Sequence, residues 1–148
     1  MLYFDTSFLA PLILPEATSD QVTKFIGGLP VEKLTVSHWT LVEFSSLLAR
    51  EVRMGGLKTQ AARLADDQFA DIIDESFVVL LPNAEDFNLA REFLKSHDTG
   101  LRAGDAFHLA IAKNHGAEAI YSLDKTMIKA GKSLGLPVTA GIRLPDYR

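Results

Sequence analysis

The sequence predicts an α/β fold, specifically a three-layer α/β/α sandwich around a mainly parallel sheet of about five strands. Short apolar runs alternate along the chain with segments of helical length, and glycine or proline falls at most of the boundaries. The runs are apolar enough to be covered on both faces, as in parallel sheets. With 148 residues, of which 47% are hydrophobic, we expect one domain spanning residues 1–148.

The predicted strands are short runs of apolar, mostly branched or aromatic residues. They cover residues 2–4, 34–36, 77–81, 119–121 and 137–139. Between them, the predicted helices cover residues 20–26, 39–54, 59–75, 85–95, 103–115 and 125–134. Glycines at positions 27–28, 55–56, 116 and 135 fall where helices are expected to end. The second and third helices should form a hairpin that caps one edge of the sheet.

Composition excludes several classes of chemistry. The chain has no cysteine, so disulfides, thiolate metal sites and cysteine nucleophiles are excluded. Its formal net charge of −4 gives no independent indication of nucleic-acid binding. No basic segment followed by an apolar stretch opens the sequence, and no apolar run reaches the length of a membrane span. We therefore expect a cytoplasmic protein with no membrane association.

Two acidic residues follow predicted strands. Asp5 comes directly after residues 2–4, and Asp124 closes the run that begins at residue 119. Binding sites of open α/β sheets form beyond the carboxyl ends of the strands, so both carboxylates should lie at one rim. The alternative is that each only caps the helix or turn that follows it.

Two further acidic residues lie in apolar helical surroundings. Glu43 is four residues from both Trp39 and Leu47, and Asp105 stands near the start of an almost wholly apolar helix. A buried carboxylate needs compensation, and no Lys or Arg lies three or four positions from Glu43. A bound metal would supply the missing charge. The alternatives are a solvated position for Glu43 and a favourable helix-dipole position for Asp105.

The four carboxylates together form an oxygen-only donor set, which hard cations such as Mg²⁺ or Mn²⁺ prefer. Two such ions about 4 Å apart activate water and stabilise the leaving oxygen in attack on phosphorus. The predicted reaction is therefore hydrolysis of a phosphodiester bond.

Four motifs in this order carry a resemblance to a known family. They are Tyr3-Phe4-Asp5-Thr6-Ser7, Glu43 in its apolar helix, the block from Leu101 to Ala110, and Ser122-Leu123-Asp124-Lys125 followed by Leu134-Gly135-Leu136-Pro137-Val138. The chain resembles the PIN-domain ribonucleases, especially VapC-type toxins of toxin–antitoxin pairs, over essentially its whole length.

The resemblance implies a role for each motif. Asp5, Glu43, Asp105 and Asp124 would bind one or two Mg²⁺ or Mn²⁺ ions, and Ser7 and Ser122 would be supporting hydroxyls. It also implies an RNA substrate, a homodimer, and an antitoxin whose C-terminal segment occludes the acidic pocket.

Two basic residues and a histidine lie close to these acids in the sequence. Arg102 and Lys125 flank two of the acids, where they would either hold the scissile phosphate or pair with the carboxylates. His108 follows Asp105 by three residues, and a core or dimer-face position is expected for it rather than a role as general base.

The sequence is compatible with two other functions. One is a non-cleaving PIN-like module that binds RNA or protein. The other is a phosphatase with Asp5 as nucleophile, although that class has a second Asp two residues later, where this chain has Ser7.

Overall fold

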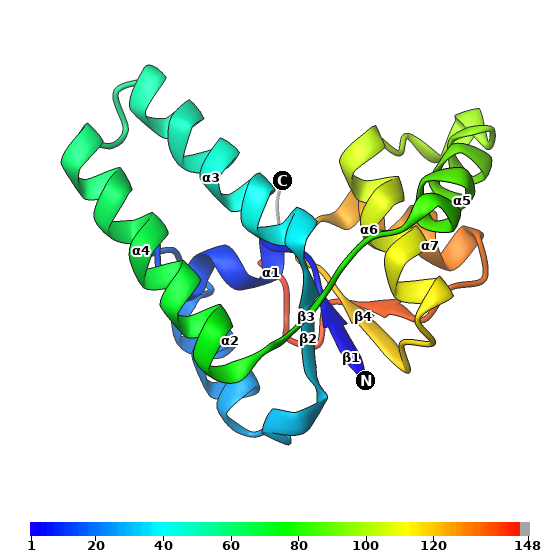
Figure 1. The fold of residues 1–148 in the computed structure, drawn as a ribbon, viewed down its shortest axis with the longest axis horizontal. Coiled ribbons are helices and arrows are strands. Elements are labelled where there is room, and N and C mark those ends of the chain that lie inside the picture. Colours follow the sequence, from blue (N-terminus) through cyan, green and yellow to red (C-terminus); the bar gives the residue numbers. More distant parts are fainter. Residues whose placement is uncertain (146–148) are drawn as a thin grey trace.

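The computed structural model describes residues 1–145, and in it a parallel sheet lies between two layers of helices (Figure 1). The strands are β1 (Leu2–Phe4), β2 (Leu34–Ser37), β3 (Val78–Leu80), β4 (Ala119–Tyr121) and β5 (Val138–Thr139). Their order is β3-β2-β1-β4-β5, and each neighbouring pair is parallel. The predicted α/β class and five-stranded sheet are confirmed.

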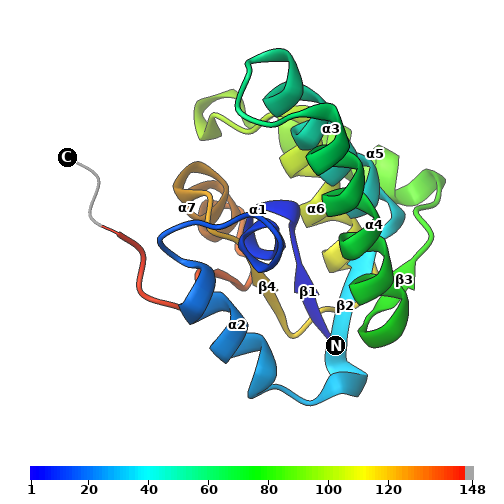
Figure 2. The same cartoon turned by 90° about the vertical axis from the view of Figure 1, so that its left-hand side faces the viewer.

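Within residues 1–145, seven α-helices connect and flank the strands. They are α1 (Thr6–Leu9), α2 (Ser19–Gly27), α3 (His38–Arg53), α4 (Thr59–Ser76), α5 (Ala84–Leu94), α6 (Ala103–Asn114) and α7 (Lys125–Ser133). Figures 1 and 2 show α1 to α4 on one side of the sheet and α5, α6 and α7 on the other. Short 3₁₀ helices occur at Ala10–Leu12, Val31–Lys33 and His97–Thr99.

Alternation along β1 divides the core into two layers. Leu2 and Phe4 pack into the cluster formed with α1 to α4, whereas Tyr3 packs into the cluster formed with α5, α6 and α7. All three side chains are buried. The central strand is therefore covered on both faces, which explains why its sequence is continuously apolar.

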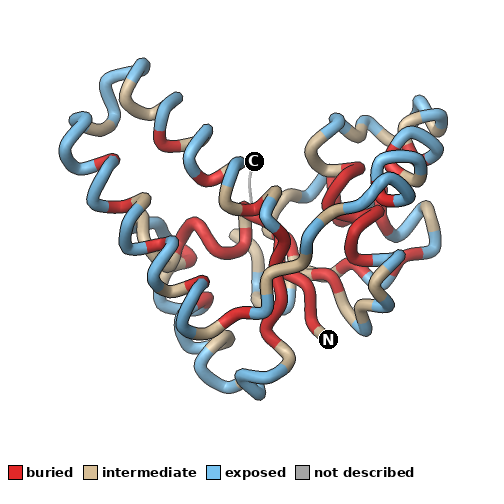
Figure 3. Tube along the Cα trace, viewed as in Figure 1, coloured by how far each residue is buried: buried red, intermediate tan, exposed pale blue. Residues whose placement is uncertain are grey.

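Helices α3 and α4 form an arm, which differs from the predicted edge cap. The base of the arm belongs to the core, where the rings of Phe44 and Phe69 stack with their centroids 4.1 Å apart. The outer turns extend beyond the sheet, and Figure 3 shows that the tip is mostly exposed. Met54, where α3 ends, is 71% exposed. The arm forms one wall of a cleft rather than a cover for the sheet edge.

The sequence did not predict α1. This helix has four residues and begins directly after Asp5, so it is too short to show a helical repeat of apolar positions. None of the helices among residues 1–145 is both long enough and apolar enough to cross a membrane.

Candidate active site

Asp5 lies at the carboxyl end of β1, and it is 3% exposed. Its Oδ1 accepts hydrogen bonds from Ser7 Oγ at 2.8 Å and from the backbone N–H of Phe8 at 3.0 Å. Its Oδ2 accepts a hydrogen bond from Ser122 Oγ at 2.6 Å. Burial raises the pKa of Asp5 above its ordinary value, although His108 and these donors act in the opposite direction. The carboxylate is fixed in one orientation by groups from two strands' ends.

Glu43 comes from α3 and contacts side chains from two other elements. Thr6 Oγ1 donates a hydrogen bond to Glu43 Oε1 at 2.7 Å, and His108 Nε2 from α6 hydrogen-bonds to the same oxygen. Burial alone would raise the pKa of Glu43, but His108 and Thr6 outweigh it, so that pKa lies below its ordinary value.

His108 connects Glu43 to the core. The ring is 1% exposed, and its Nδ1 lies 2.7 Å from the hydroxyl of Tyr3, which lies 2.9 Å from Ser37 Oγ. Burial raises the pKa of Tyr3, so its hydroxyl keeps its proton. The expected buried position of His108 is correct, but the side chain also has a role that the sequence did not indicate, because it orients a candidate acid.

Glu43 has a hydrogen-bonding partner that its own helix does not supply. The sequence offered no Lys or Arg three or four positions away along the same helix, and the partner is instead His108, whose ring hydrogen-bonds to Glu43 from α6. Metal binding is therefore not required to explain why a carboxylate lies in this part of α3.

Asp105 lies in the first turn of α6. Burial and the negative charges of Asp124, Asp5 and Glu43, in that order, raise the pKa of Asp105 to about 6. All four carboxylates line the same cleft. The structure brings together the four acids that the sequence singled out.

Asp124 follows β4 and begins α7. Its Oδ1 accepts a hydrogen bond from the N–H of Met127 at 3.1 Å, and its own N–H donates to Ser122 Oγ at 3.1 Å. Asp5 caps α1 in the same way. Capping and a position in the site were posed as alternatives for these residues, and the structure shows both at once.

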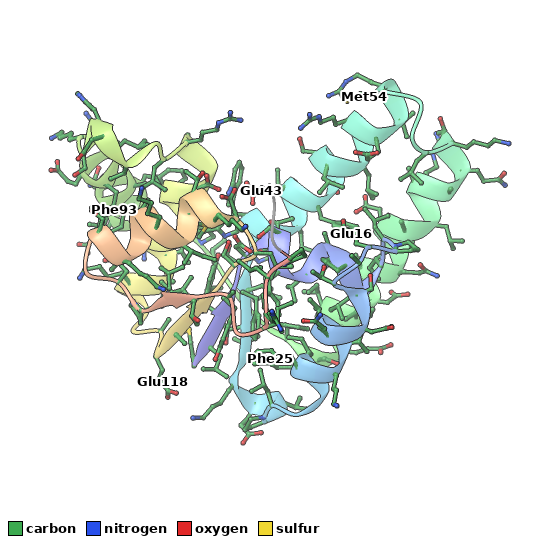
Figure 4. The ribbon with its side chains drawn as sticks, turned by 180° about the vertical axis from the view of Figure 1, so that it is seen from behind. Glu16, Phe25, Glu43, Met54, Phe93 and Glu118 are labelled. Atoms are coloured by element: carbon green, nitrogen blue, oxygen red, sulfur yellow. The ribbon has the colours of Figure 1, made fainter. Side chains whose placement is uncertain are left out.

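An open cleft of about 940 Å³ contains all four acids. Its walls come from α3, from the start of α6 and from the ends of β1 and β4, and Figure 4 shows Glu43 on the inner part of α3, between the two helical layers. Ser7 and Arg102 also line the cleft. Lys125 is not part of the lining formed by residues 1–145, and its Nζ donates a hydrogen bond to the carbonyl oxygen of Pro145 at 3.3 Å.

The cleft lies next to β1, at the point where the strand order of the sheet reverses. The chain passes from β1 to β2 and β3 on one side, and β4 and β5 add on the other side of β1. Asp5 follows β1 and Asp124 follows β4, and the N–H of Asp5 bonds to the carbonyl of Tyr121 at 3.0 Å. Such a switch point is the usual location of binding sites in open α/β sheets.

Comparison with known families identifies this arrangement. A PIN domain matches residues 2–133, a range that includes every acid of the cleft. The chain belongs to the PIN domain family. No curated protein sequence matches the chain.

Solved structures have the same fold. VapC20 of Mycobacterium tuberculosis, described as a sarcin-ricin loop cleaving toxin, is 25% identical with a TM-score of 0.70, and the match covers 88% of this chain and 95% of that one. FitAcB of Neisseria gonorrhoeae is 18% identical with a TM-score of 0.72, covering 95% and 98%. VapBC-1 of nontypeable Haemophilus influenzae is 16% identical with a TM-score of 0.67, also covering 95% and 98%. The resemblance to VapC-type PIN domains is confirmed.

The acidic side chains of this PIN domain site offer only carboxylate oxygen atoms as metal ligands. Oxygen-only ligands suit Mg²⁺ and Mn²⁺, and burial and the neighbouring carboxylates raise the pKa of Asp105. Within residues 1–145, however, no three acidic or histidine side chains are close enough together to hold an ion. The oxygen-only chemistry of the residues fits a hard cation, although the four carboxylates do not converge on one point within residues 1–145.

Two features of the PIN domain site were not found from the sequence. One is Thr6, which lies between Asp5 and Ser7 in the first motif and donates to Glu43. The other is a pair of arginines, Arg50 and Arg53, which line the cleft from α3. Their spacing of seven and ten residues from Glu43 places them on its helix face, and that signal is visible in the sequence.

Proposed function

We propose that this PIN domain is a metal-dependent endoribonuclease and the toxin of a type II toxin–antitoxin pair. The observation that carries the proposal is the meeting of Asp5, Glu43, Asp105 and Asp124, from four separate segments, in one cleft. The description of VapC20 as a toxin that cleaves the sarcin-ricin loop supports RNA as the substrate class.

The four carboxylates are the groups that would hold Mg²⁺ or Mn²⁺. Two such ions would activate a water molecule and stabilise the leaving oxygen in hydrolysis of the phosphodiester bond. Ser7 and Ser122 fix both oxygens of Asp5, so that this carboxylate keeps its orientation while substrate binds. Thr6 and His108 do the same for Glu43 and leave its second oxygen, Oε2, without a hydrogen bond within residues 1–145.

Arg102 is better placed than Lys125 to contact a phosphate of the substrate. Arg102 lines the cleft, is exposed and forms no ion pair with residues 1–145. We propose that it contacts a phosphate of the substrate. Lys125 follows Asp124 and starts α7, and its bond to Pro145 would have to break before it could take the same role.

The phosphatase alternative receives no support from the geometry of Asp5. That class has a second Asp two residues after the nucleophile, whereas this chain has Ser7 there, whose hydroxyl donates a hydrogen bond to Asp5 Oδ1. The cleavage assay described next distinguishes the nuclease from the non-cleaving binding module.

Cleavage of total cellular RNA by the purified protein tests the nuclease. We expect cleavage with Mg²⁺ or Mn²⁺, no cleavage with chelator, and no cleavage by Asp5→Asn. Asp71→Asn is the matched control, since Asp71 is exposed on α4 and does not line the cleft. Retained cleavage by a folded Asp5→Asn protein would contradict the assignment, and a folded wild type without any cleavage would favour the binding module.

We also propose a homodimer in the cytoplasm and an antitoxin partner, as the family resemblance implies. Support for a protein interface comes from large apolar side chains left exposed at β3 and the start of α5, namely Val78, Leu81 and Phe87. Light scattering after size exclusion tests the dimer, and a monomer at micromolar concentration would contradict it.

A further inference from the structure

Three arginines line the acidic cleft without a partner in the protein. Arg50 and Arg53 come from α3, and Arg102 precedes the first turn of α6. Within residues 1–145 none of the three forms an ion pair or a side-chain hydrogen bond. A guanidinium group presents several donors in a plane that matches phosphate, so unpaired arginines in a cleft are suited to a phosphate ligand.

The arginines of α3 are aligned with the acids. Trp39, Glu43, Ser46, Arg50 and Arg53 all line the cleft, and their steps of four, three, four and three residues place them along one face of the helix. With a rise of about 1.5 Å per residue, Arg50 lies about 10 Å and Arg53 about 15 Å beyond Glu43 along the helix axis. The face therefore leads from the carboxylates toward the tip of the arm.

We propose that this face of α3 is the binding track for single-stranded RNA that flanks the cleaved bond, with Arg50 and Arg53 binding successive backbone phosphates. The proposal rests on the nuclease function proposed above. Arg102 faces the same strand from the α6 side of the cleft, at the level of the acids.

The size of the cleft favours a single strand. Its volume of about 940 Å³ falls in the range of roughly 300 to 1,000 Å³ that suits drug-sized ligands. That space accommodates a few nucleotides of a single strand. Trp39 also lines the cleft, where its indole lowers the pKa of Glu43.

The distribution of charge also distinguishes RNA from a protein segment. Five carboxylates line the cleft, those of Asp5, Glu43, Glu51, Asp105 and Asp124. A polyanion is held there when divalent cations sit on the acids and arginines hold the neighbouring phosphates. A protein partner would instead need a basic group over the acids and an acidic group along α3, and the experiment below separates the two.

The test is RNA binding measured without cleavage. A short, fluorescently labelled single-stranded RNA of mixed sequence is titrated with the full chain at salt concentrations from about 50 to about 200 mM. Ca²⁺ replaces Mg²⁺ and Mn²⁺, because it neutralises the carboxylates while its larger, less regular coordination does not suit the two-metal reaction. The variants are Arg50→Gln with Arg53→Gln, the charge-retaining pair Arg50→Lys with Arg53→Lys, and the control Arg63→Gln with Arg91→Gln. Both control residues are exposed and lie outside the cleft.

We expect the glutamine pair in α3 to weaken binding about tenfold at low salt. The slope of log affinity against log salt should fall by about 1.4, because each lost phosphate contact to a single strand contributes roughly 0.7. The lysine pair should keep most of the slope, the control pair should match wild type, and the RNA duplex of the same sequence should bind more weakly than the single strand. Thermal melting confirms that each variant is folded.

Several results would overturn the proposal. They are equal losses in the glutamine pair and its control, tighter binding of the duplex, absence of RNA binding by the folded wild type, and normal RNA binding by the glutamine pair. The last result would assign the arginines to a protein partner. RNA that binds as expected but is never cleaved with metal would contradict the nuclease function and leave the track standing.

Discussion

At the scale of single residues, Asp105 is a half-buried carboxylate whose surroundings disfavour its charged form. Burial and three acidic neighbours raise its pKa from 3.8 to about 6. The folded state therefore binds more protons than the unfolded chain between these values, and this group's contribution to stability falls as pH rises through that window. Above about pH 6, the folded protein carries a destabilising charge at Asp105 unless a cation neutralises it.

Replacing Asp105 with Asn should therefore stabilise the metal-free protein at neutral pH. We expect a free energy of unfolding higher than wild type by on the order of 1 kcal/mol, since solvent screens a half-buried group. The difference should shrink as pH falls and vanish below about pH 3, where Asp105 is protonated in both folded and unfolded states. Urea denaturation with chelator at the two pH values measures it, and a variant less stable than wild type at neutral pH would contradict the account.

Ser122 is expected to be needed for both stability and cleavage. Its buried hydroxyl donates to Asp5 Oδ2 and accepts from the N–H of Asp124. Ser122→Ala should lower the free energy of unfolding by about 1 to 3 kcal/mol, because buried partners are left unsatisfied, and it should reduce the cleavage rate. Chemical denaturation and RNA cleavage check the two effects.

Ser45→Ala is the matched control for that change. Ser45 also donates to an aspartate, at 2.9 Å from the oxygens of Asp66, but it is exposed on the arm. Its loss should change stability by no more than about 0.5 kcal/mol. Equal effects of the two substitutions would show that the Asp5 contact has no special weight.

The residues of the site were predictable to different extents. Asp5 and Asp124 were found because they follow strands of a parallel sheet, where carboxyl ends share a rim. Glu43 was found from its apolar neighbours, but its contact with His108 joins residues 65 positions apart. No local pattern reports a pairing across that distance, so the sequence placed His108 in the core without its role.

At the scale of elements, the start of α6 is shaped by a glycine. A Cβ added at Gly104 would lie 2.6 Å from Glu43 Oε2, whereas its other near contacts, with Trp39, are at ordinary distances. The absence of a side chain lets the Glu43 carboxylate lie against the first turn of α6. The position therefore serves the site rather than the helix.

Gly104→Ala should separate activity from stability. The free energy of unfolding should change by no more than about 1 kcal/mol, because alanine favours a helix by about that amount and the Glu43 side chain can move aside. Cleavage should fall strongly, since the oxygen that moves belongs to the site. Melting and RNA cleavage of the same preparation measure both quantities.

Gly131→Ala provides the opposite case in α7. A Cβ there would lie 2.3 Å from Val138 Cγ2, in the core. We expect a loss of about 1 to 3 kcal/mol in stability from overpacking, with cleavage affected only as far as the protein unfolds. A Gly104→Ala protein that cleaves RNA as wild type does would contradict the role given to that position.

The long elements were predictable and the short ones were not. The helices predicted over 39–54 and 59–75 occur as His38–Arg53 and Thr59–Ser76, because apolar residues recur along them at helical spacing. The four residues of α1 and the short 3₁₀ turns have no room for such a pattern. The helical hairpin was predicted, but its expected place as a cap on the sheet edge differs from the arm observed, because hairpin formation is a local property and packing on the sheet is not.

At the scale of the whole molecule, the sheet order explains why separate segments form one site. With β1 between β2 and β4, the ends of β1 and β4 are neighbours, and α3 begins at the end of β2 on the other side. The sequence predicted strands and helices but carried no signal for this order. The shared rim of Asp5 and Asp124 followed from the parallel class alone, whereas the arm and its arginines required the structure.

The measurement that tests the central claim most directly is calorimetric titration of Mn²⁺ into the purified protein. The account predicts saturable binding to wild type, weakened at least about tenfold by Asp5→Asn and unchanged by Asp71→Asn on the far side of the arm. Equal binding by all three proteins, or none by the folded wild type, would contradict the claim that these carboxylates form a metal-binding catalytic cleft.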